Sequence, residues 1–287
     1  MCISPKWLVP FYDSSKERYS YRYVGSLPVD APEDPVIDEV TGEVFFPFQV
    51  GCGKCLECLN LHKLQWLHRL LDEQSCHQDS CFLTLTYAKT DGNLVPKDYQ
   101  LFLKRLRRKI APVKVRFFLC GEYGSRGHRP HYHVALFGYN FPDKIPFRKD
   151  RAGFMMYRSA ELEKLWSHGF SSILPANSVT FGYISKDMQK LLDLEPGKVR
   201  PFLRMSLRPG IGSNGWNRSL TDGKVWHRGK SCVLPRYYRK LAKDESLDLS
   251  AVYRIDSRYA ENRSLIQDVE LKRKKNTEKL KKLLTNR

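Results

Sequence analysis

Alternation of hydrophobic and polar positions is the clearest pattern in the middle of the chain. It is typical of strands, because successive side chains of a strand point to opposite faces of a sheet. The alternation is strongest in Phe82–Tyr87, where leucines and threonines take turns. Four segments are predicted to be strands on patterns of this kind: residues 82–87, 114–122, 131–138 and 170–174.

Apolar residues that recur every three or four positions predict helices around these strands. We expect one helix over 59–74 and a second over 97–110, where Pro96 gives a favourable start and the arginines point outward. A third is expected over 159–168, ended by Gly169, and a fourth from Tyr183 onward. The elements predict an α+β fold, in which an antiparallel sheet carries helices on one face.

Two histidines lie one residue apart in the predicted strand 131–138. Residues i and i+2 of a strand share a face, so His131 and His133 present two imidazoles side by side. Neutral imidazole is the commonest metal ligand in proteins. Two surface histidines can also alternate without binding anything, and the pattern alone does not decide between a metal site and this alternative.

Glu122 ends the preceding predicted strand, and a short glycine-rich loop separates the two strands. Strands joined by short loops usually pair antiparallel, so Glu122 can lie beside the two histidines. Two imidazoles and a carboxylate suit Mg²⁺ or Mn²⁺ carrying a phosphate, and Zn²⁺ or Fe²⁺ also fits. The alternative is a Glu122 that is a solvated turn residue.

Tyr183 opens the last predicted helix, and Lys186, Asp187 and Lys190 follow at spacings that place all four on one side. A phenol aimed at a metal-bound phosphodiester, with ammonium groups nearby, can attack phosphorus and form a phosphotyrosyl ester. A tyrosine beside lysines on a helix is more often a packed or surface residue, and this alternative stays open.

Three cysteines, Cys52, Cys55 and Cys58, fall within seven residues. Their spacing is too close for a disulfide framework, and a cytosolic chain would keep them reduced. Two thiolates at this spacing form half of a common zinc site, and Cys2 would complete a set of four if the N-terminus folds back. A structural zinc ion is the favoured interpretation; an iron–sulfur cluster and unligated thiols are the alternatives.

Basic residues outnumber acidic ones, with 49 Lys and Arg against 31 Asp and Glu, for a net charge of +18. Such an excess favours association with phosphate backbones. Residues 104–116 contain no acidic residue, and residues 198–243 contain only Asp222. Because both stretches flank the predicted phosphate site, they favour a DNA-binding track, and solvated helix faces are the alternative. The candidate DNA contacts are Arg105, Arg108, Arg129, Lys190 and Arg236.

Several segments together resemble the three motifs of the HUH endonucleases: residues 82–87, residues 121–124 running on to 129–133, and residues 183–186. More narrowly, the chain resembles the replication initiators of gokushovirus-type microviruses, which are small circular single-stranded DNA phages. Further matches are residues 1–2, 51–58, 209–212 and 234–238, so the resemblance covers most of the chain.

The resemblance implies a sheet with one face open for DNA and metal. In such a core His131, His133 and Glu122 would hold Mg²⁺ or Mn²⁺, Tyr183 would be the nucleophile, and Lys186 would offset charge beside it. Proteins of this family nick the origin of a double-stranded replicative form, keep the 5′ phosphate on tyrosine and leave a 3′-OH for a host polymerase. They then rejoin the displaced strand into a circle.

The same resemblance implies partners and a location. The partners are single-stranded and supercoiled double-stranded origin DNA, with a host DNA polymerase and helicase, in the host cell cytoplasm. No stretch approaches the ~20 apolar residues of a membrane-spanning helix, and the first residues lack a secretory signal pattern, so no membrane partner is expected. Four regions are predicted: a Cys-cluster segment with its helix (1–75), the HUH core (76–195), a basic C-terminal part of the core (196–260), and a basic helical or disordered tail (261–287).

One departure from the family pattern concerns the nucleophile. Relatives that cleave and rejoin with two tyrosines carry the second one four residues after the first, where this chain has Asp187. Either Tyr183 serves both steps, or a second tyrosine comes from elsewhere; the available ones are Tyr87, Tyr157, Tyr237 and Tyr238. Two other functions also remain: an HUH plasmid initiator or transposase, and a non-catalytic, zinc-anchored protein that binds single-stranded DNA.

Overall fold

A computed structural model describes residues 6–26, 36–42, 44–45, 48–124, 127–186, 197–221, 224–227 and 229–245. These residues divide into two compact units, which meet in the chain at His62 and Lys63. Helix α1 (Leu56–Gln74) contributes to both units.

The first unit contains two small antiparallel sheets. One has the order β2-β1-β5 (β1 Lys6–Asp13, β2 Arg18–Ser26, β5 Phe48–Val50), and the other pairs β3 (Val36–Ile37) with β4 (Val44–Phe45). Asp38 holds the turn after β3, because its carboxylate accepts the backbone N–H groups of Val40 and Thr41 at 3.0 and 2.9 Å. The acidic stretch of the sequence therefore includes a hairpin.

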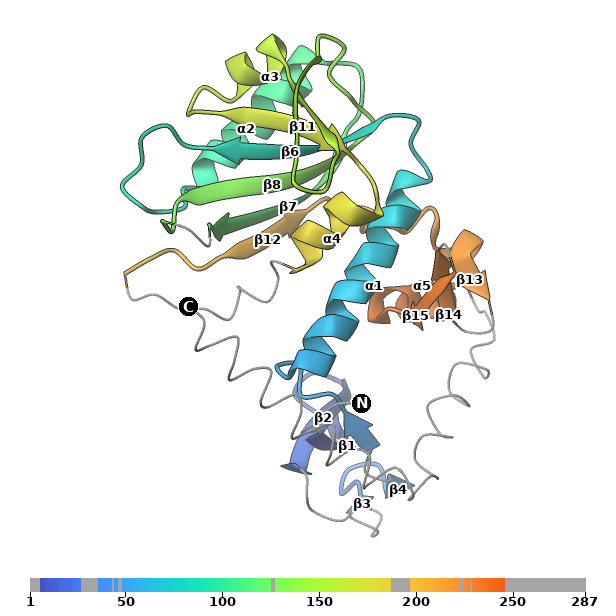
Figure 1. The fold of residues 1–287 in the computed structure, drawn as a ribbon. Coiled ribbons are helices and arrows are strands. Elements are labelled where there is room, and N and C mark those ends of the chain that lie inside the picture. Colours follow the sequence, from blue (N-terminus) through green and yellow to red (C-terminus); the bar gives the residue numbers. More distant parts are fainter. Residues whose placement is uncertain are drawn as a thin grey trace. The chain divides into compact units, whose positions relative to one another are not determined.

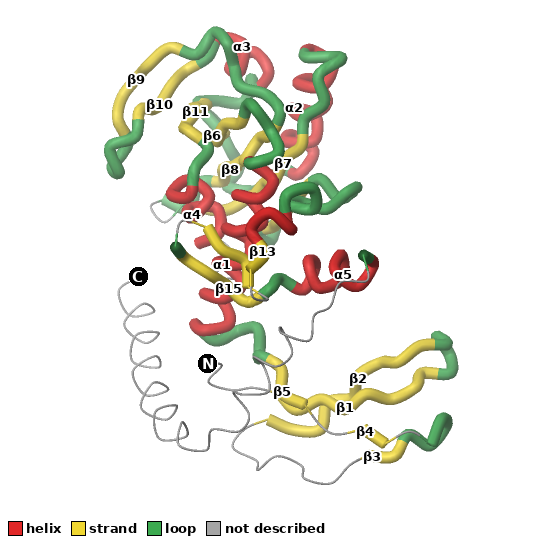
Figure 2. The backbone as a smooth tube through the Cα atoms, turned by 90° about the vertical axis from the view of Figure 1, so that its right-hand side faces the viewer, coloured by secondary structure: helices red, strands yellow, loops and turns green. Residues whose placement is uncertain are grey.

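The second unit is built on a seven-stranded antiparallel sheet in the order β12-β7-β8-β6-β11-β10-β9 (Figures 1 and 2). Its strands are β6 Ser80–Thr86, β7 Arg116–Tyr123, β8 Pro130–Phe137, β9 Ile145–Lys149, β10 Met155–Arg158, β11 Ser171–Pro175 and β12 Phe202–Met205. The four strands predicted from the sequence are all present and pair antiparallel. The predicted α+β fold with an antiparallel sheet is confirmed.

One face of this sheet packs against α2 (Pro96–Lys109) and α3 (Ala160–Leu165). The strands contribute Leu83, Leu119 and Val134, all fully buried, and α2 contributes Phe102 and Leu106. We call it the α2 face. The basic residues of α2 lie on its exposed side, as the spacing of its apolar residues predicts.

The opposite face is not bare, in contrast to the expectation that helices cover one face only. Its apolar residues Phe82, Phe118 and Phe137 pack against α1 and α4 (Ser178–Lys186), so we call it the α4 face. Both helices have an apolar side that must be buried, and this end of the face supplies the partner surface. The open part of the α4 face is therefore limited to the other end of the strands.

Two predicted helix boundaries are corrected. Helix α4 begins at Ser178, five residues before Tyr183, because the Asn177 side chain accepts the N–H groups of Val179 and Thr180 at 2.9 and 3.0 Å. Helix α3 ends at Leu165, not at 168. Gly169 serves a close approach of two backbones, since a Cβ there would lie 2.3 Å from the amide nitrogen of Ala88.

A second small sheet, which the sequence did not predict, follows the central sheet. Its strands are β13 Leu220–Thr221, β14 Lys224–His227 and β15 Lys230–Val233, followed by α5 (Arg236–Asp244). Buried Asp72 of α1 links it to the helix, accepting the Tyr238 hydroxyl at 2.7 Å and lying 2.8 Å from Nε2 of His227. Among the described residues, none of the helices is long and apolar enough to span a membrane.

Candidate metal centre

Polar side chains replace the phenylalanines at the open end of the α4 face. Strand register places Thr84 opposite His133 between β6 and β8, and Thr86 opposite His131 one step further. On the other side of β8, His131 pairs with Glu122 of β7. Three neighbouring strands at the centre of the sheet thus bring these residues to one place, since positions two apart on a strand share a face.

The two histidines and Glu122 converge as the sequence predicts. Oε1 of Glu122 lies 2.8 Å from Nε2 of His131 and 3.7 Å from Nε2 of His133. One ligand atom from each side chain lies within 4.8 Å of the others. Glu122 is 2% exposed, whereas both imidazoles are partly exposed, so the cluster has a buried base and a side open to solvent.

Hydrogen bonds at the far ring nitrogens suit both imidazoles to metal binding. Nδ1 of His131 lies 3.1 Å from the carbonyl oxygen of Arg129, and Nδ1 of His133 lies 3.1 Å from Oγ1 of Thr84. With the proton on Nδ1, each ring turns a lone pair on Nε2 toward the Glu122 carboxylate. Three electron-pair donors then face one another, and this N₂O set fits a divalent cation.

Thr84 is a site residue that the sequence analysis did not nominate. Its signal was present, because Thr84 and Thr86 share one side of a predicted strand. The pairing of that strand with the histidine strand was needed to interpret it. The Phe82 ring adds a second restraint on His133, stacking on it with ring centroids 5.5 Å apart.

Tyr183 lies in the middle of α4, and its side chain is 38% exposed. Phe181 and Ile184, on either side of it in sequence, are fully buried against the α4 face. The Lys186 side chain, Asp187 and Lys190 lie outside the described residues. The predicted row of charged groups beside the tyrosine therefore stays a prediction.

Two of the alternative tyrosines have engaged hydroxyls. Tyr87 donates to Asp98 at 2.8 Å, and Tyr238 donates to Asp72 at 2.7 Å. Burial, together with these carboxylates, raises the pKa of both phenols. Neither hydroxyl is poised to attack a phosphate, which leaves Tyr183 as the best exposed nucleophile of the set that includes them.

The candidate DNA contacts are dispersed over the unit. The Arg129 guanidinium donates to the carbonyl oxygens of Tyr87 and Ala88 at 2.6 and 3.2 Å. Arg105 lies on α2, at the α2 face, and donates to the carbonyl of Leu165 at 3.0 and 2.8 Å. Both arginines therefore have structural partners. Arg108 and Arg236 are exposed on α2 and α5, and a DNA-binding role for the whole set stays a prediction.

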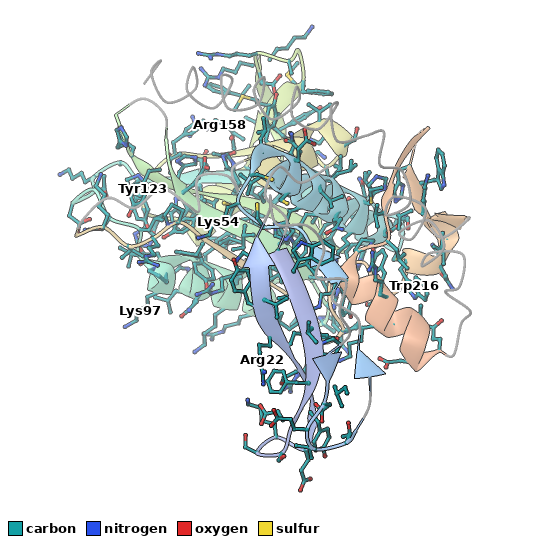
Figure 3. The ribbon with its side chains drawn as sticks, turned by 90° about the horizontal axis from the view of Figure 1, so that it is seen from below. Arg22, Lys54, Lys97, Tyr123, Arg158 and Trp216 are labelled. Carbon is teal, nitrogen blue, oxygen red and sulfur yellow. The ribbon has the colours of Figure 1, made fainter. Side chains whose placement is uncertain are left out.

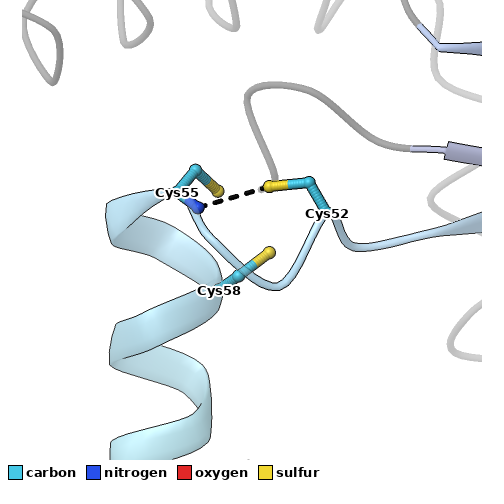
Figure 4. Close-up of side chains that lie close together, drawn as sticks. All are labelled: Cys52, Cys55 and Cys58. Atoms are coloured by element: carbon cyan, nitrogen blue, oxygen red, sulfur yellow. Dashed lines mark hydrogen bonds between the residues drawn. The ribbon is translucent and has the colours of Figure 1, made fainter. Parts of the chain in front are cut away.

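The cysteine cluster forms a second candidate metal site, in the first unit (Figure 4). The Sγ atoms of Cys52, Cys55 and Cys58 lie within 4.8 Å of one another, and Cys52 Sγ accepts the Cys55 N–H at 3.3 Å. A Cβ on Gly51 would lie 2.9 Å from Cys58 Sγ, so only glycine leaves room for this sulfur. Three convergent sulfurs fit a soft cation such as Zn²⁺. Cys2, the predicted fourth ligand, lies outside the described residues.

Comparison with known proteins places the chain among phage replication proteins. A sequence family described as replication-associated proteins of the ORF2 type matches residues 80–192, which contain the candidate centre and Tyr183. Replication-associated protein VP4 of Bdellovibrio phage phiMH2K is 30% identical over 216 residues, which cover 67% of each chain. No solved structure matches.

Two further relatives show more limited matches. Replication-associated protein ORF4 of Chlamydia phage 1 is 29% identical over 50% of this chain and 39% of the relative. Replication-associated protein ORF2 of Spiroplasma virus 4 is 25% identical over 57% of this chain and 55% of the relative. The chain thus matches less than two thirds of the length of these two proteins. From the extent of the match to the Bdellovibrio phage protein, this chain belongs to the family of replication-associated proteins of microviruses.

Proposed function

We propose that this chain starts rolling-circle replication of phage DNA by nicking one origin strand and holding its 5′ phosphate on Tyr183. The observation that carries the proposal is the convergence of Glu122, His131 and His133 at the open end of the sheet. Membership in a family of replication-associated proteins supports the same assignment.

The centre is suited to a divalent ion held by Nε2 of both histidines and a carboxylate oxygen of Glu122. Mg²⁺ or Mn²⁺ bound there would polarise the scissile phosphate and neutralise charge that builds up in the transition state. Thr84 and the Arg129 carbonyl hold the imidazoles in the tautomer that ligation requires. The buried base of the cluster keeps water away from one side of the carboxylate.

The chemical step is a transesterification. The Tyr183 phenol loses its proton to water and its oxygen attacks phosphorus, while the bond between phosphorus and the 3′ oxygen breaks. The departing 3′ oxygen takes a proton from water and becomes the free 3′-OH that a host polymerase extends. Lys186, one turn along α4 from Tyr183, offsets the charge of the reacting groups. The phosphotyrosyl ester retains the bond energy, so the reverse step can close a displaced strand into a circle.

This function defines the partners of the chain. The substrates are single-stranded origin DNA and the supercoiled double-stranded form, and replication after the nick needs a host polymerase and helicase. The work would take place in the host cell cytoplasm. The zinc site at Cys52, Cys55 and Cys58 would have a structural role in the first unit.

The test uses 5′-labelled and 3′-labelled single-stranded oligonucleotides that tile the phage origin, incubated with the full chain and Mn²⁺ or EDTA. On denaturing gels, a metal-dependent covalent adduct is expected on the fragment downstream of the cut. Tyr183→Phe should bind the DNA but form no adduct, and His131→Ala should abolish nicking. Tyr157→Phe is the matched control and should retain the adduct.

The outcomes separate the candidate functions. An adduct that survives Tyr183→Phe would move the nucleophile to another residue. Oligonucleotides that are bound but never cut with any divalent metal would refute the proposal and favour a non-catalytic protein that binds single-stranded DNA.

A further inference from the structure

Two phenylalanines are exposed together near the outer edge of the central sheet. Phe147 on β9 is 48% exposed and Phe170, just before β11, is 36% exposed, with ring centroids 6.0 Å apart. Single exposed apolar residues are common on protein surfaces, whereas a pair of adjacent exposed aromatic rings has a larger cost in water and often marks a binding surface. Strand β9 is exposed along its whole length (Figure 2).

Strand register places Phe170 on the same face as the candidate metal centre. Ser172 pairs with Thr84, so Phe170, two residues earlier, falls beside Thr86. Both the N–H and the hydroxyl of Thr86 donate to the Phe170 carbonyl, at 2.9 and 2.8 Å. Because Thr86 is opposite His131, Phe170 lies two strand positions across the sheet from the centre.

An irregularity in β9 brings Phe147 to this surface. The pairing with β10 shifts between Met156 and Tyr157, which leaves Phe147 as an extra residue between Pro146 and Arg148. Such a bulge redirects a side chain and is frequent beside functional sites. Here it places the Phe147 ring next to Phe170.

Two arginines accompany the rings. The guanidinium of Arg158, labelled in Figure 3, lies 5.7 Å from the Phe147 ring centroid and 5.4 Å from that of Phe170. Arg148 lies 5.4 Å from the Phe147 centroid. Glu163 orients Arg158 through an ion pair of 2.6 Å. Aromatic rings interleaved with guanidinium groups are the combination that single-stranded nucleic acid favours, with rings for the bases and cations for the phosphates.

We propose that Phe147 and Phe170 form a stacking site for unpaired DNA bases, with Arg148 and Arg158 beside the phosphates of the same strand. The positive charge of the arginines and continuity with the centre at His131 favour this occupant over an apolar protein segment. The site would guide the strand from the β9 edge toward the metal centre, and this direction rests on the proposed nicking function.

The test measures binding without cleavage. Fluorescence anisotropy in EDTA compares a labelled oligothymidine with an abasic oligonucleotide of the same length, using the full chain. The wild-type protein should bind oligothymidine more tightly than the abasic strand. Removing a stacking ring should weaken oligothymidine binding about fivefold or more. The double variant Phe147→Ala/Phe170→Ala should therefore lose most of the contrast and leave abasic binding unchanged.

Three further variants make the test specific. Phe147→Leu/Phe170→Leu keeps apolar volume but has no aromatic face, so it should lose the contrast even if the alanine variant unfolds. Arg148→Gln should weaken binding of both strands and reduce the salt dependence by roughly 0.7 in the log–log slope, the value for one phosphate contact on a single strand. Trp226→Ala, which removes an exposed ring on β14, should change neither affinity.

The proposal is overturned if the leucine and alanine double variants keep the wild-type contrast, or if they weaken both strands equally. The adduct assay is independent of this measurement. A chain without a Tyr183 adduct that still shows the contrast would refute the nicking function and support the stacking site. An adduct formed normally by a chain without the contrast would refute the stacking site alone.

Discussion

Replacing Thr84 with valine is expected to weaken divalent metal binding without removing any ligand. The Thr84 hydroxyl lies 3.1 Å from Nδ1 of His133, and valine has a similar shape but no hydroxyl. Without this partner the His133 ring is free to carry its proton on Nε2, the nitrogen that faces Glu122. A proton on Nε2 excludes metal ligation by that ring.

The size of the effect follows from what else holds the ring. Loss of an outer hydrogen-bond partner of a metal-binding histidine costs roughly 10- to 100-fold in metal affinity. Phe82 still stacks on His133, and the Thr84 side chain is half-buried, so water can replace part of the lost interaction. We therefore expect the lower end, about a tenfold loss, which corresponds to ~1.4 kcal/mol.

The assay is a titration of the full chain with Mn²⁺, followed by electron paramagnetic resonance of the free ion. Thr86→Val is the matched control. It removes the same group from the same strand and face, but this hydroxyl bonds the Phe170 carbonyl and no histidine. The control should keep wild-type affinity. An unchanged affinity in Thr84→Val, or an equal loss in both variants, would refute the role assigned to Thr84.

Two other predictions concern pH and zinc. Burial lowers the pKa of His68 to about 4, with His227 adding to the shift and Asp72 opposing it. Because the unfolded chain binds this proton near pH 6.5, the folded state should lose stability as the pH falls from about 6.5 to 4. His68→Leu should flatten urea-measured stability across that window, and an unchanged slope would contradict this. Purified protein should contain zinc, which Cys55→Ser should lose and Cys76→Ser retain; equal zinc in both variants would disprove ligation by the cluster.

The pairing of β7 with β8 could be predicted because all its signals are local. A short glycine-rich loop between two alternating segments sets an antiparallel register, and the i, i+2 spacing of His131 and His133 fixes their common face. Glu122 follows from the same register. The convergence of the three side chains was therefore available from about twenty residues of sequence.

Other features depend on contacts between distant segments. The amphipathic pattern of α1 indicates an apolar side but not which sheet face will cover it, so the occupied end of the α4 face was not foreseen. The start of α4 was missed because Val179, Thr180 and Gly182 are weak helix formers, and the Asn177 cap offsets their low propensity. Strand β9 contains Pro146 and is exposed throughout, so it lacks the alternation by which a strand is identified.

The burial of α4 has a consequence for its tyrosine. Phe181 and Ile184 are both fully buried against the α4 face, while Tyr183 between them is exposed. Turning the helix enough to redirect Tyr183 would expose both apolar side chains, at a cost of about 1.5–3 kcal/mol each. The Asn177 cap fixes the first turn of the helix in the same way. A nucleophile on this helix is therefore held by packing before DNA binds, and its orientation does not depend on the loop chemistry that usually positions exposed tyrosines.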